Sequence, residues 1–192
     1  MSPLSPAIPN SCVVSQGALW RGAKPDAAGA AALISLGVHS VVNLELFHDD
    51  LDAFLAARPS TVLSTHIDYF QIRDWEPNVV IAPVLLDSHV AQFIAIVKTQ
   101  EKPIYVHCRS GQNRTGVMIA TYRILIEGML IESAISEMWR YQGIWFKQDA
   151  EYLRSLTGEH RARIEKMIAS RQQDVRADLR LACSALGCFQ QK

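Results

Sequence analysis

Apolar positions along the chain follow two spacings, one typical of strands and one typical of helices. Short runs rich in β-branched residues, such as residues 38–44, predict strands with buried side chains. Elsewhere apolar residues recur every three or four positions, as at Leu86, Val90 and Val97, which predicts helices with one face in a core. Strand and helix patterns alternate, and this order predicts an α/β fold.

Turn and capping residues set the limits of the predicted elements. Gly37 and Gly128 are suited to end helices, and Pro83 suits the first position of one. Pro77 disfavours helical dihedrals at the preceding residue, so residues 73–78 are predicted to form a loop. The expected strands are residues 12–15, 18–21, 38–44, 66–72 and 103–107. The expected helices are residues 25–37, a short one from residue 49, 83–98, 117–127, 131–140 and 148–180.

This pattern predicts one domain over residues 1–192, without an internal repeat or a linker. We expect a central, mostly parallel sheet of about four or five strands flanked by helices, with a loop between a buried strand and a buried helix. Residues 12–157 would form the core. Residues 158–192 would form a C-terminal helical extension with a basic, solvated face; a partner or phospholipid surface is the alternative.

The net charge of the chain and the lengths of its apolar runs argue against several classes of function. The chain has 19 Lys and Arg against 19 Asp and Glu, so its formal net charge is zero and no nucleic-acid footprint is visible. The first residues hold several prolines and no basic group, unlike a secretory signal peptide. No apolar run approaches the roughly 18 residues of a membrane span. We therefore expect a cytoplasmic protein without a membrane span, whose oligomeric state the sequence does not reveal.

The four cysteines show no zinc-binding spacing, and no metal or other cofactor is expected. A disulfide framework is not expected in a chain of this size without a signal peptide. Cys12, Cys183 and Cys188 are therefore predicted to be free thiols, with a redox role for the last two as the alternative.

Cys108 lies where a buried strand meets a polar loop that leads into an apolar helix. Unpartnered N–H groups and the helix dipole make such a helix start an anion site, which also stabilises a thiolate. Arg114 can bind two phosphate oxygens with its planar guanidinium. Thr115 can donate its hydroxyl to the sulfur, or cap the helix.

The remaining loop residues would support this site. Gly111 and Gly116 permit the backbone to curl around a ligand. His107 is expected to orient the loop by hydrogen bonding, and a plain buried polar residue is the alternative. The residues expected to surround the phosphate are Arg109, Ser110, Gly111, Gln112, Asn113 and Arg114, of which Arg109 could instead be solvated.

The segment HCRSGQNRTG, from His107 to Gly116, resembles the HCxxGxxR[ST]G signature of the protein tyrosine phosphatase superfamily. A weaker resemblance to compact dual-specificity-like members extends over residues 12–157. The resemblance implies a phosphocysteine intermediate, no metal, and a mobile acid loop ahead of the nucleophile. The chain is too short for the large tyrosine-specific enzymes, which carry glycine at the position of Asn113, and both departures favour the smaller branch.

Ester cleavage by this route needs a general acid to protonate the leaving oxygen. Asp74, in the predicted loop before the nucleophile, lies where similar phosphatases place this aspartate. Glu76 and Asp87 are the alternatives, although Asp87 falls within a helical pattern where a solvated face is expected.

The sequence therefore predicts a phosphomonoester hydrolase, a protein tyrosine or dual-specificity phosphatase acting on a phosphorylated protein or a small phosphate ester. One alternative is an inositol phosphate or phosphoinositide phosphatase, and another is a module that binds phosphate without turnover. A sulfur-transferring or arsenate-reducing enzyme would also use a cysteine loop, but the Arg-Thr-Gly run and the upstream aspartate suit ester cleavage better.

Overall fold

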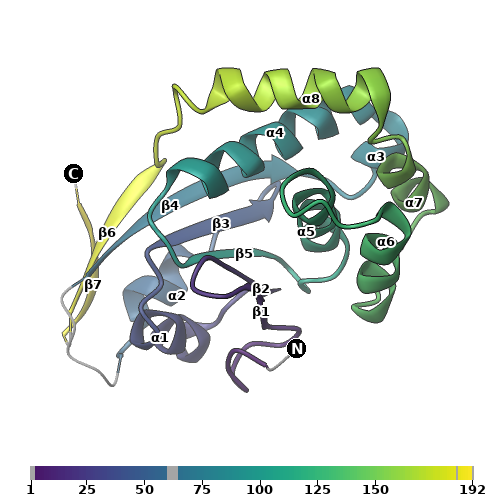
Figure 1. Cartoon of the computed structure of the whole chain (residues 1–192). Coiled ribbons are helices and arrows are strands. Elements are labelled where there is room, and N and C mark those ends of the chain that lie inside the picture. Colours follow the sequence, from purple (N-terminus) through teal and green to yellow (C-terminus); the bar gives the residue numbers. More distant parts are fainter. Residues whose placement is uncertain (1–2, 60–64, 185, 192) are drawn as a thin grey trace.

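A mixed sheet forms the centre of the computed structural model, which describes residues 3–59, 65–184 and 186–191 (Figure 1). Within these residues the sheet has seven strands in the order β1-β2-β5-β3-β4-β6-β7. The inner strands β2, β5, β3 and β4 are parallel, and β1, β6 and β7 are antiparallel to their neighbours. The α/β class is confirmed, but the expected number of about four or five strands is too low. The strands are β1 (Cys12–Ser15), β2 (Leu19–Ala23), β3 (Ser40–Glu45), β4 (Thr65–Asp74), β5 (Ile104–Cys108), β6 (Leu179–Ser184) and β7 (Gly187–Gln191).

Helices cover both faces of this sheet (Figure 1). One face packs against α1 and α2, and the other packs against α4 and α5, with α8 lying on α4. The helices are α1 (Ala27–Ser35), α2 (Leu51–Ala56), α3 (Asn78–Ile81), α4 (Pro83–Thr99), α5 (Asn113–Leu125), α6 (Ile131–Arg140), α7 (Lys147–Arg154) and α8 (Gly158–Arg171).

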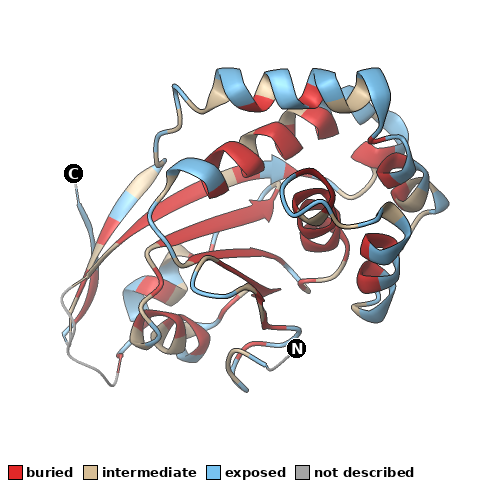
Figure 2. Ribbon diagram, in the orientation of Figure 1, coloured by how far each residue is buried: buried red, intermediate tan, exposed pale blue. Residues whose placement is uncertain are grey.

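Burial explains why the inner strands read as continuous apolar runs. Every residue of β2, β3 and β5 is buried, as Figure 2 shows in red, because parallel strands covered on both faces have no solvent side. Neighbouring residues of β3 enter different clusters: Val41 packs with Leu33 of α1, whereas Val42 packs on the α4 side. Burial of each such side chain stabilises the fold by about 1.5–3 kcal/mol. The two apolar layers fix the sheet between them.

The C-terminal part differs from the predicted helical extension. Residues 148–180 do not form one helix, because α7 ends at Arg154 and a separate helix, α8, begins at Gly158, whose positive φ of 50° does not fit a continuous right-handed helix. After α8 the chain forms β6 and β7, which extend the same sheet beyond β4. Buried positions alternate along β6, with Leu181 and Cys183 inside. This alternation is the period of a half-buried strand. It spans only a few residues and follows a longer helical pattern, so it did not stand out in the sequence.

Cys183 and Cys188 form a disulfide, so the expectation that both are free thiols is wrong. The two residues lie directly opposite each other in the β6–β7 hairpin. Antiparallel partners bring Cβ atoms close enough for such a bond. Cys108 keeps a free thiol, and the Cys12 sulfur lies 2.9 Å from the Tyr141 hydroxyl.

The inner parallel strands point their carboxyl ends to one edge of the sheet, and the predicted phosphate loop lies at this edge. The loop is shorter than expected, because α5 begins at Asn113 and not at residue 117. β4 is longer than expected and includes Asp74, which the sequence had suggested to be in a loop. In open parallel sheets ligands bind at this edge. Among the described residues, no helix is long and apolar enough to cross a membrane.

Candidate active site

The phosphate loop connects β5 directly to α5. Cys108 is the last residue of β5 and is 2% exposed, and Gln112 is the N-cap of α5. The first N–H groups of a helix have no helical acceptors, and the helix dipole adds positive potential. The Cys108 sulfur, the loop amides and the start of α5 therefore lie next to one another, which is the arrangement expected from the sequence for an anion site.

Gly111 is the residue that lets this loop turn. Its φ is +71°, and an added Cβ would lie 2.4 Å from the carbonyl carbon of Gly22 and 2.6 Å from the nitrogen of Ala23. The loop is thus packed directly on the backbone of β2. Gly116 has a different role from the one expected, because it lies within α5 and lets Met138 of α6 approach to 3.0 Å of its Cβ position.

Arg114 folds back from the first turn of α5 toward the ends of β3 and β4. Its Nη1 donates to the carbonyl oxygens of Leu44 and Asp74, both at 3.3 Å. Its Nη2 lies 2.8 Å from Glu76 Oε1. These contacts fix the plane of the guanidinium, which can bind an oxyanion with two parallel bonds.

The candidate acids face different surroundings. The Asp74 side chain is buried, and its Oδ1 accepts a bond of 2.8 Å from Asn78 Nδ2 and lies 2.8 Å from His89 Nδ1. Glu76 instead pairs with Arg114 and lines a cavity of about 180 Å³ beside it. The structure therefore brings Glu76, and not the carboxylate of Asp74, to Arg114.

Asp87 does not lie on a solvated face, contrary to the expectation. It is buried within α4 and accepts hydrogen bonds from Tyr152 (2.9 Å) and Arg163 (3.0 Å), and it lies 2.9 Å from His160. Its charge is compensated by groups from α7 and α8, since the helical pattern of α4 places it under those helices. Asp87 thus joins α4 to α7 and α8.

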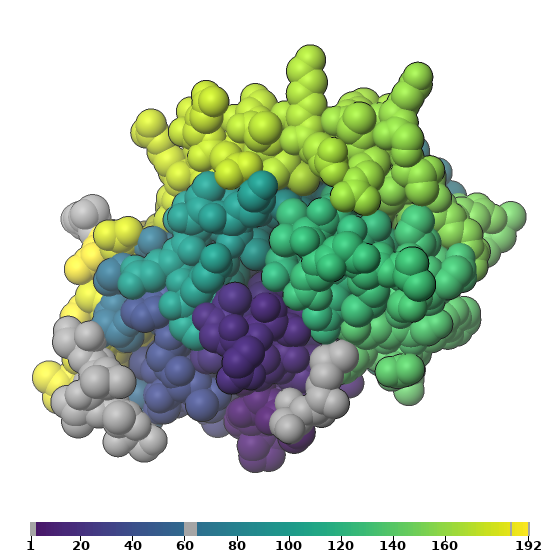
Figure 3. Space-filling model, in the orientation of Figure 1, coloured from purple at the N-terminus to yellow at the C-terminus, as the bar shows by residue number. Residues whose placement is uncertain are grey.

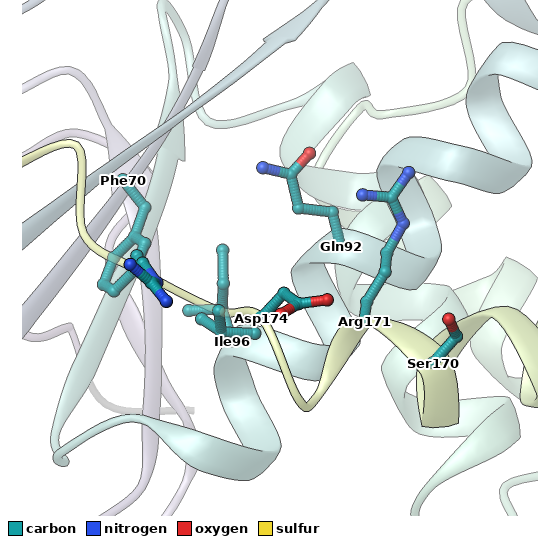
Figure 4. A pocket seen from close by; sticks show the side chains of 8 residues that line it. Phe70, Gln92, Ile96, Ser170, Arg171 and Asp174 are labelled. Atoms are coloured by element: carbon teal, nitrogen blue, oxygen red, sulfur yellow. The ribbon is translucent and has the colours of Figure 1, made fainter.

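The small cavity shows which predicted residues meet at the surface. Arg109 is exposed and lies on this cavity with Arg114, and the aromatic rings of Phe47 and Trp75 form part of its wall. Another cavity of about 210 Å³ lies between α4 and the end of α8 and contains none of the predicted site residues (Figure 4). Within the described part of the chain, no group of three or more His, Cys, Asp or Glu side chains could hold a metal ion.

Thr115 and His107 are completely buried behind the loop. The Thr115 hydroxyl has no hydrogen-bond partner among the described residues, which leaves it able to donate to a thiolate. His107 Nε2 lies 3.2 Å from Asp50 Oδ2, and its ring stacks on Tyr105. Burial raises the pKa of Asp50, but the charge of His107 and hydrogen bonds from His107 and Tyr69 outweigh it, so this pKa lies below its usual value.

Asn113 ties the end of the loop to the segment after α6. Its Nδ2 donates to Gly143 O at 2.7 Å and to Asp149 Oδ2 at 2.8 Å. The same carboxylate oxygen accepts the N–H groups of Trp145 and Phe146. Burial raises the pKa of Asp149, although these hydrogen bonds oppose the rise. The Asn113 side chain therefore anchors the end of the loop to Gly143 and Asp149. Ser110 and Gln112 are half-buried at the rim.

Sequence reasoning missed three buried charged residues near the loop: Arg21, Asp50 and Asp149. Arg21 donates through Nη2 to Gly111 O at 2.6 Å. A signal was present, because Arg21 is a charged residue within the otherwise apolar run LWRGA, and charges in buried strands need a partner. The identity of that partner could not be read from the sequence.

The sequence is similar to those of known phosphatases. A family model described as "DSP-PTPase phosphatase fused to NAD+ Kinase" matches residues 9–152. Dual specificity protein phosphatase TpbA of Pseudomonas aeruginosa (strain UCBPP-PA14) is 36% identical over 124 residues, covering 64% of this chain and 50% of that protein. The chain thus spans about half the length of this relative. The RNA/RNP complex-1-interacting phosphatase of Rattus norvegicus is 43% identical over 56 residues, or 29% of this chain and 17% of that protein.

Solved structures share the fold. The crystal structure of P. aeruginosa TpbA has a TM-score of 0.59 at 23% identity and covers 88% of this chain and 99% of that one. The catalytic core of the PP-IP phosphatase SIW14 from S. cerevisiae has a TM-score of 0.62 at 20% identity, covering 89% and 98%. Such identities establish the fold alone. Since the family match spans most of the chain and includes the whole phosphate loop, the protein belongs to the DSP-PTPase family, the compact dual-specificity-like branch of the protein tyrosine phosphatase superfamily.

Proposed function

We propose that this protein hydrolyses phosphate monoesters through a phosphocysteine intermediate on Cys108. The observation that carries the proposal is the convergence of a free thiol, the oriented guanidinium of Arg114 and the start of α5 on one loop. Each of these groups has a function in phosphoryl transfer. The sulfur attacks phosphorus, and the guanidinium of Arg114 and the loop amides hold the phosphate oxygens.

In the first step the Cys108 thiolate forms a bond to phosphorus while the ester P–O bond breaks. The leaving oxygen takes the electron pair and a proton from the general acid. In the second step water attacks the phosphocysteine, the P–S bond breaks and the sulfur takes the pair. The same carboxylate removes the proton from water, and the Thr115 hydroxyl can donate to the departing sulfur.

We infer that Glu76 is the general acid, in preference to the expected Asp74. The ion pair of Glu76 with Arg114 puts its carboxyl beside the group that would hold the phosphate. A bound phosphate would replace Glu76 as the partner of Arg114. The bonds of Asp74 to Asn78 and His89 suit a residue that fixes the acid segment instead.

The test compares Glu76→Gln with Asp74→Asn on aryl phosphates whose leaving groups differ in pKa. Glu76→Gln should lower kcat by roughly 10²–10⁴-fold on poor leaving groups and much less on acidic phenols, because an acidic phenol scarcely needs the proton. It should also remove the fall of activity with rising pH. Asp74→Asn should lower activity equally for all leaving groups. The reverse pattern would return the acid role to Asp74. Cys108→Ser should abolish turnover, and residual activity in that variant would refute the covalent mechanism.

The substrate we propose is an aryl phosphate such as phosphotyrosine in a phosphorylated protein. Phe47 is 81% exposed and Trp75 is 45% exposed, and both line the cavity at Arg114, where they can flank a phenyl ring. Arg109 at the same cavity favours the second candidate, an inositol phosphate or phosphoinositide with a further phosphate group. A panel of phosphopeptides, small phosphate esters and inositol phosphates, compared by kcat/KM, decides between them. Phosphate binding without turnover of any substrate would indicate a recognition module.

A cytoplasmic location remains a proposal, and one feature weighs against it. Disulfides persist in oxidising compartments and are rare in cytosolic proteins, and Cys183–Cys188 is a disulfide. Differential alkylation of the two cysteines in protein taken rapidly from its native cells would test the point. Fully reduced cysteines would support the cytoplasm, and a retained bond would oppose it.

A further inference from the structure

Three successive carbonyl groups of the phosphate loop are hydrogen-bonded by the N-terminal segment. Lys24 N donates to Arg109 O at 3.3 Å, Asn10 Nδ2 donates to Ser110 O at 2.8 Å, and Arg21 Nη2 donates to Gly111 O at 2.6 Å. In the space-filling view the N-terminal part, in purple, lies against the green part of the chain that contains α5 (Figure 3). The loop is therefore held by a part of the chain about 85–100 residues away in sequence.

Arg21 is the buried member of this set. It is 1% exposed, and β2 places it next to Val106 of β5, the strand that ends at the nucleophile. Its guanidinium carbon lies 4.0 Å from the centre of the Tyr141 ring, an arrangement that stabilises a cation. Burial lowers the pKa of Arg21, and the neighbouring Cys12, Tyr141, Glu137 and Cys108 oppose this fall.

Peptide geometry links these carbonyls to the anion site. In a trans peptide the C=O of one residue and the N–H of the next point in opposite directions. The N-terminal segment holds the carbonyls of Arg109, Ser110 and Gly111 on the side of the loop that faces away from the anion site. The N–H groups that follow them, those of residues 110–112, therefore point toward the anion site. A preorganised set of N–H groups binds an oxyanion without the cost of reorienting them.

We propose that Arg21 is a positioning residue that, together with Asn10, holds the phosphate loop in its anion-binding conformation. This inference rests on the proposed phosphatase function but assigns no step of the chemistry to Arg21. An apolar side chain would fill the same volume with a smaller desolvation cost, since a buried guanidinium is expensive. The bond to Gly111 O accounts for the charge at this position.

The test uses Arg21→Met, which keeps much of the volume and removes the donor, and Arg21→Lys, which keeps a charge and a donor. Arg21→Met should lower kcat/KM on an aryl phosphate by about 10²-fold, the effect of a displacement of roughly 1 Å in a reacting group. The loss should be equal for good and poor leaving groups, and inorganic phosphate should inhibit less strongly. Arg21→Lys should recover part of the lost kcat/KM and part of the lost inhibition by inorganic phosphate.

Leu33→Ala is the matched control, because Leu33 is completely buried in the cluster on the opposite face of the sheet. Asn10→Asp is the second test variant: Asn10 is exposed, its φ of 53° suits aspartate, and a carboxylate cannot donate to Ser110 O. It should also weaken phosphate inhibition, without a change in Tm. This variant decides the question if Arg21→Met does not fold.

A folded Arg21→Met with wild-type phosphate inhibition and kcat would overturn the proposal. So would a loss no larger than that of Leu33→Ala at equal Tm, since it would reflect stability alone. If the wild-type protein hydrolyses no ester, the proposed function fails. Calorimetric binding of inorganic phosphate to wild type, Arg21→Met and Asn10→Asp then still decides whether Arg21 and Asn10 shape the loop.

Discussion

Gly111→Ala should lower the activity of the protein about 10²-fold while leaving its fold largely intact. The added Cβ would lie 2.4 Å from the carbonyl carbon of Gly22, 2.5 Å from its oxygen and 2.6 Å from Ala23 N. Ordinary contact begins at about 3.4 Å, so the loop must move by roughly 1 Å or distort β2. Because these neighbours are backbone atoms of a central strand, the loop is the part that will move.

The energetic effect has two parts. An alanine at a φ of +71° costs about 1–2 kcal/mol, and overpacking of a close contact costs about 1–3 kcal/mol. If the loop moves, part of the second cost is relieved at the expense of the anion site. A displacement of roughly 1 Å then lowers kcat/KM by about 10²-fold.

Gly37→Ala is the matched control for this experiment. Gly37 has a similar φ of +82°, but no atom lies within 4 Å of its added Cβ. It should therefore show the backbone penalty of about 1–2 kcal/mol in urea unfolding, with unchanged kcat/KM. We would measure both variants by urea unfolding and by turnover of an aryl phosphate. Wild-type activity in Gly111→Ala would refute the reasoning, as would an equal loss in Gly37→Ala.

Two further predictions concern stability. Since the pKa of Asp50 is lowered in the folded state, its ionised form stabilises the fold above the unfolded pKa, and this contribution is lost as the pH falls through the folded pKa. Asp50→Asn should therefore flatten the loss of stability below about pH 4 in urea titrations, and an unchanged acid profile would contradict the assignment. Replacing both Cys183 and Cys188 by serine should lower the free energy of unfolding by about 2 kcal/mol, as expected for closing a short loop. The double replacement should leave kcat/KM unchanged, because Cys183 pairs with Thr65, and Thr65 and Asp74 are the two ends of β4. A large loss of activity would show that the hairpin influences the site.

Short-range patterns in the sequence were sufficient for the parts of the molecule that are locally encoded. α4 and α6 occur nearly where their apolar periodicity predicts them, because one face of each is buried, from Leu86 to Val97 in α4 and from Ala134 to Met138 in α6. The predicted anion-binding loop is also local: the strand, Cys108, Gly111 and Arg114 lie within a few residues, so their spacing alone predicts the site. Even there, the pattern did not reveal that the helix begins at Asn113, since polar residues in its first turn resemble a loop.

Only the tertiary structure decided the features that join distant segments. Arg21 and Gly111 meet because β2 lies beside β5, and no periodicity in either segment indicates that order. Asp74 and Glu76 are two positions apart, yet one is held by His89 of α4 and the other by Arg114 of α5. β6 is recognisable as a strand only when β4 offers it a partner, because a short alternating segment gains its hydrogen bonds from the neighbour and not from itself. The sequence by itself therefore determined which residues form the loop between β5 and α5, whereas strand order and packing determined which side chains surround it.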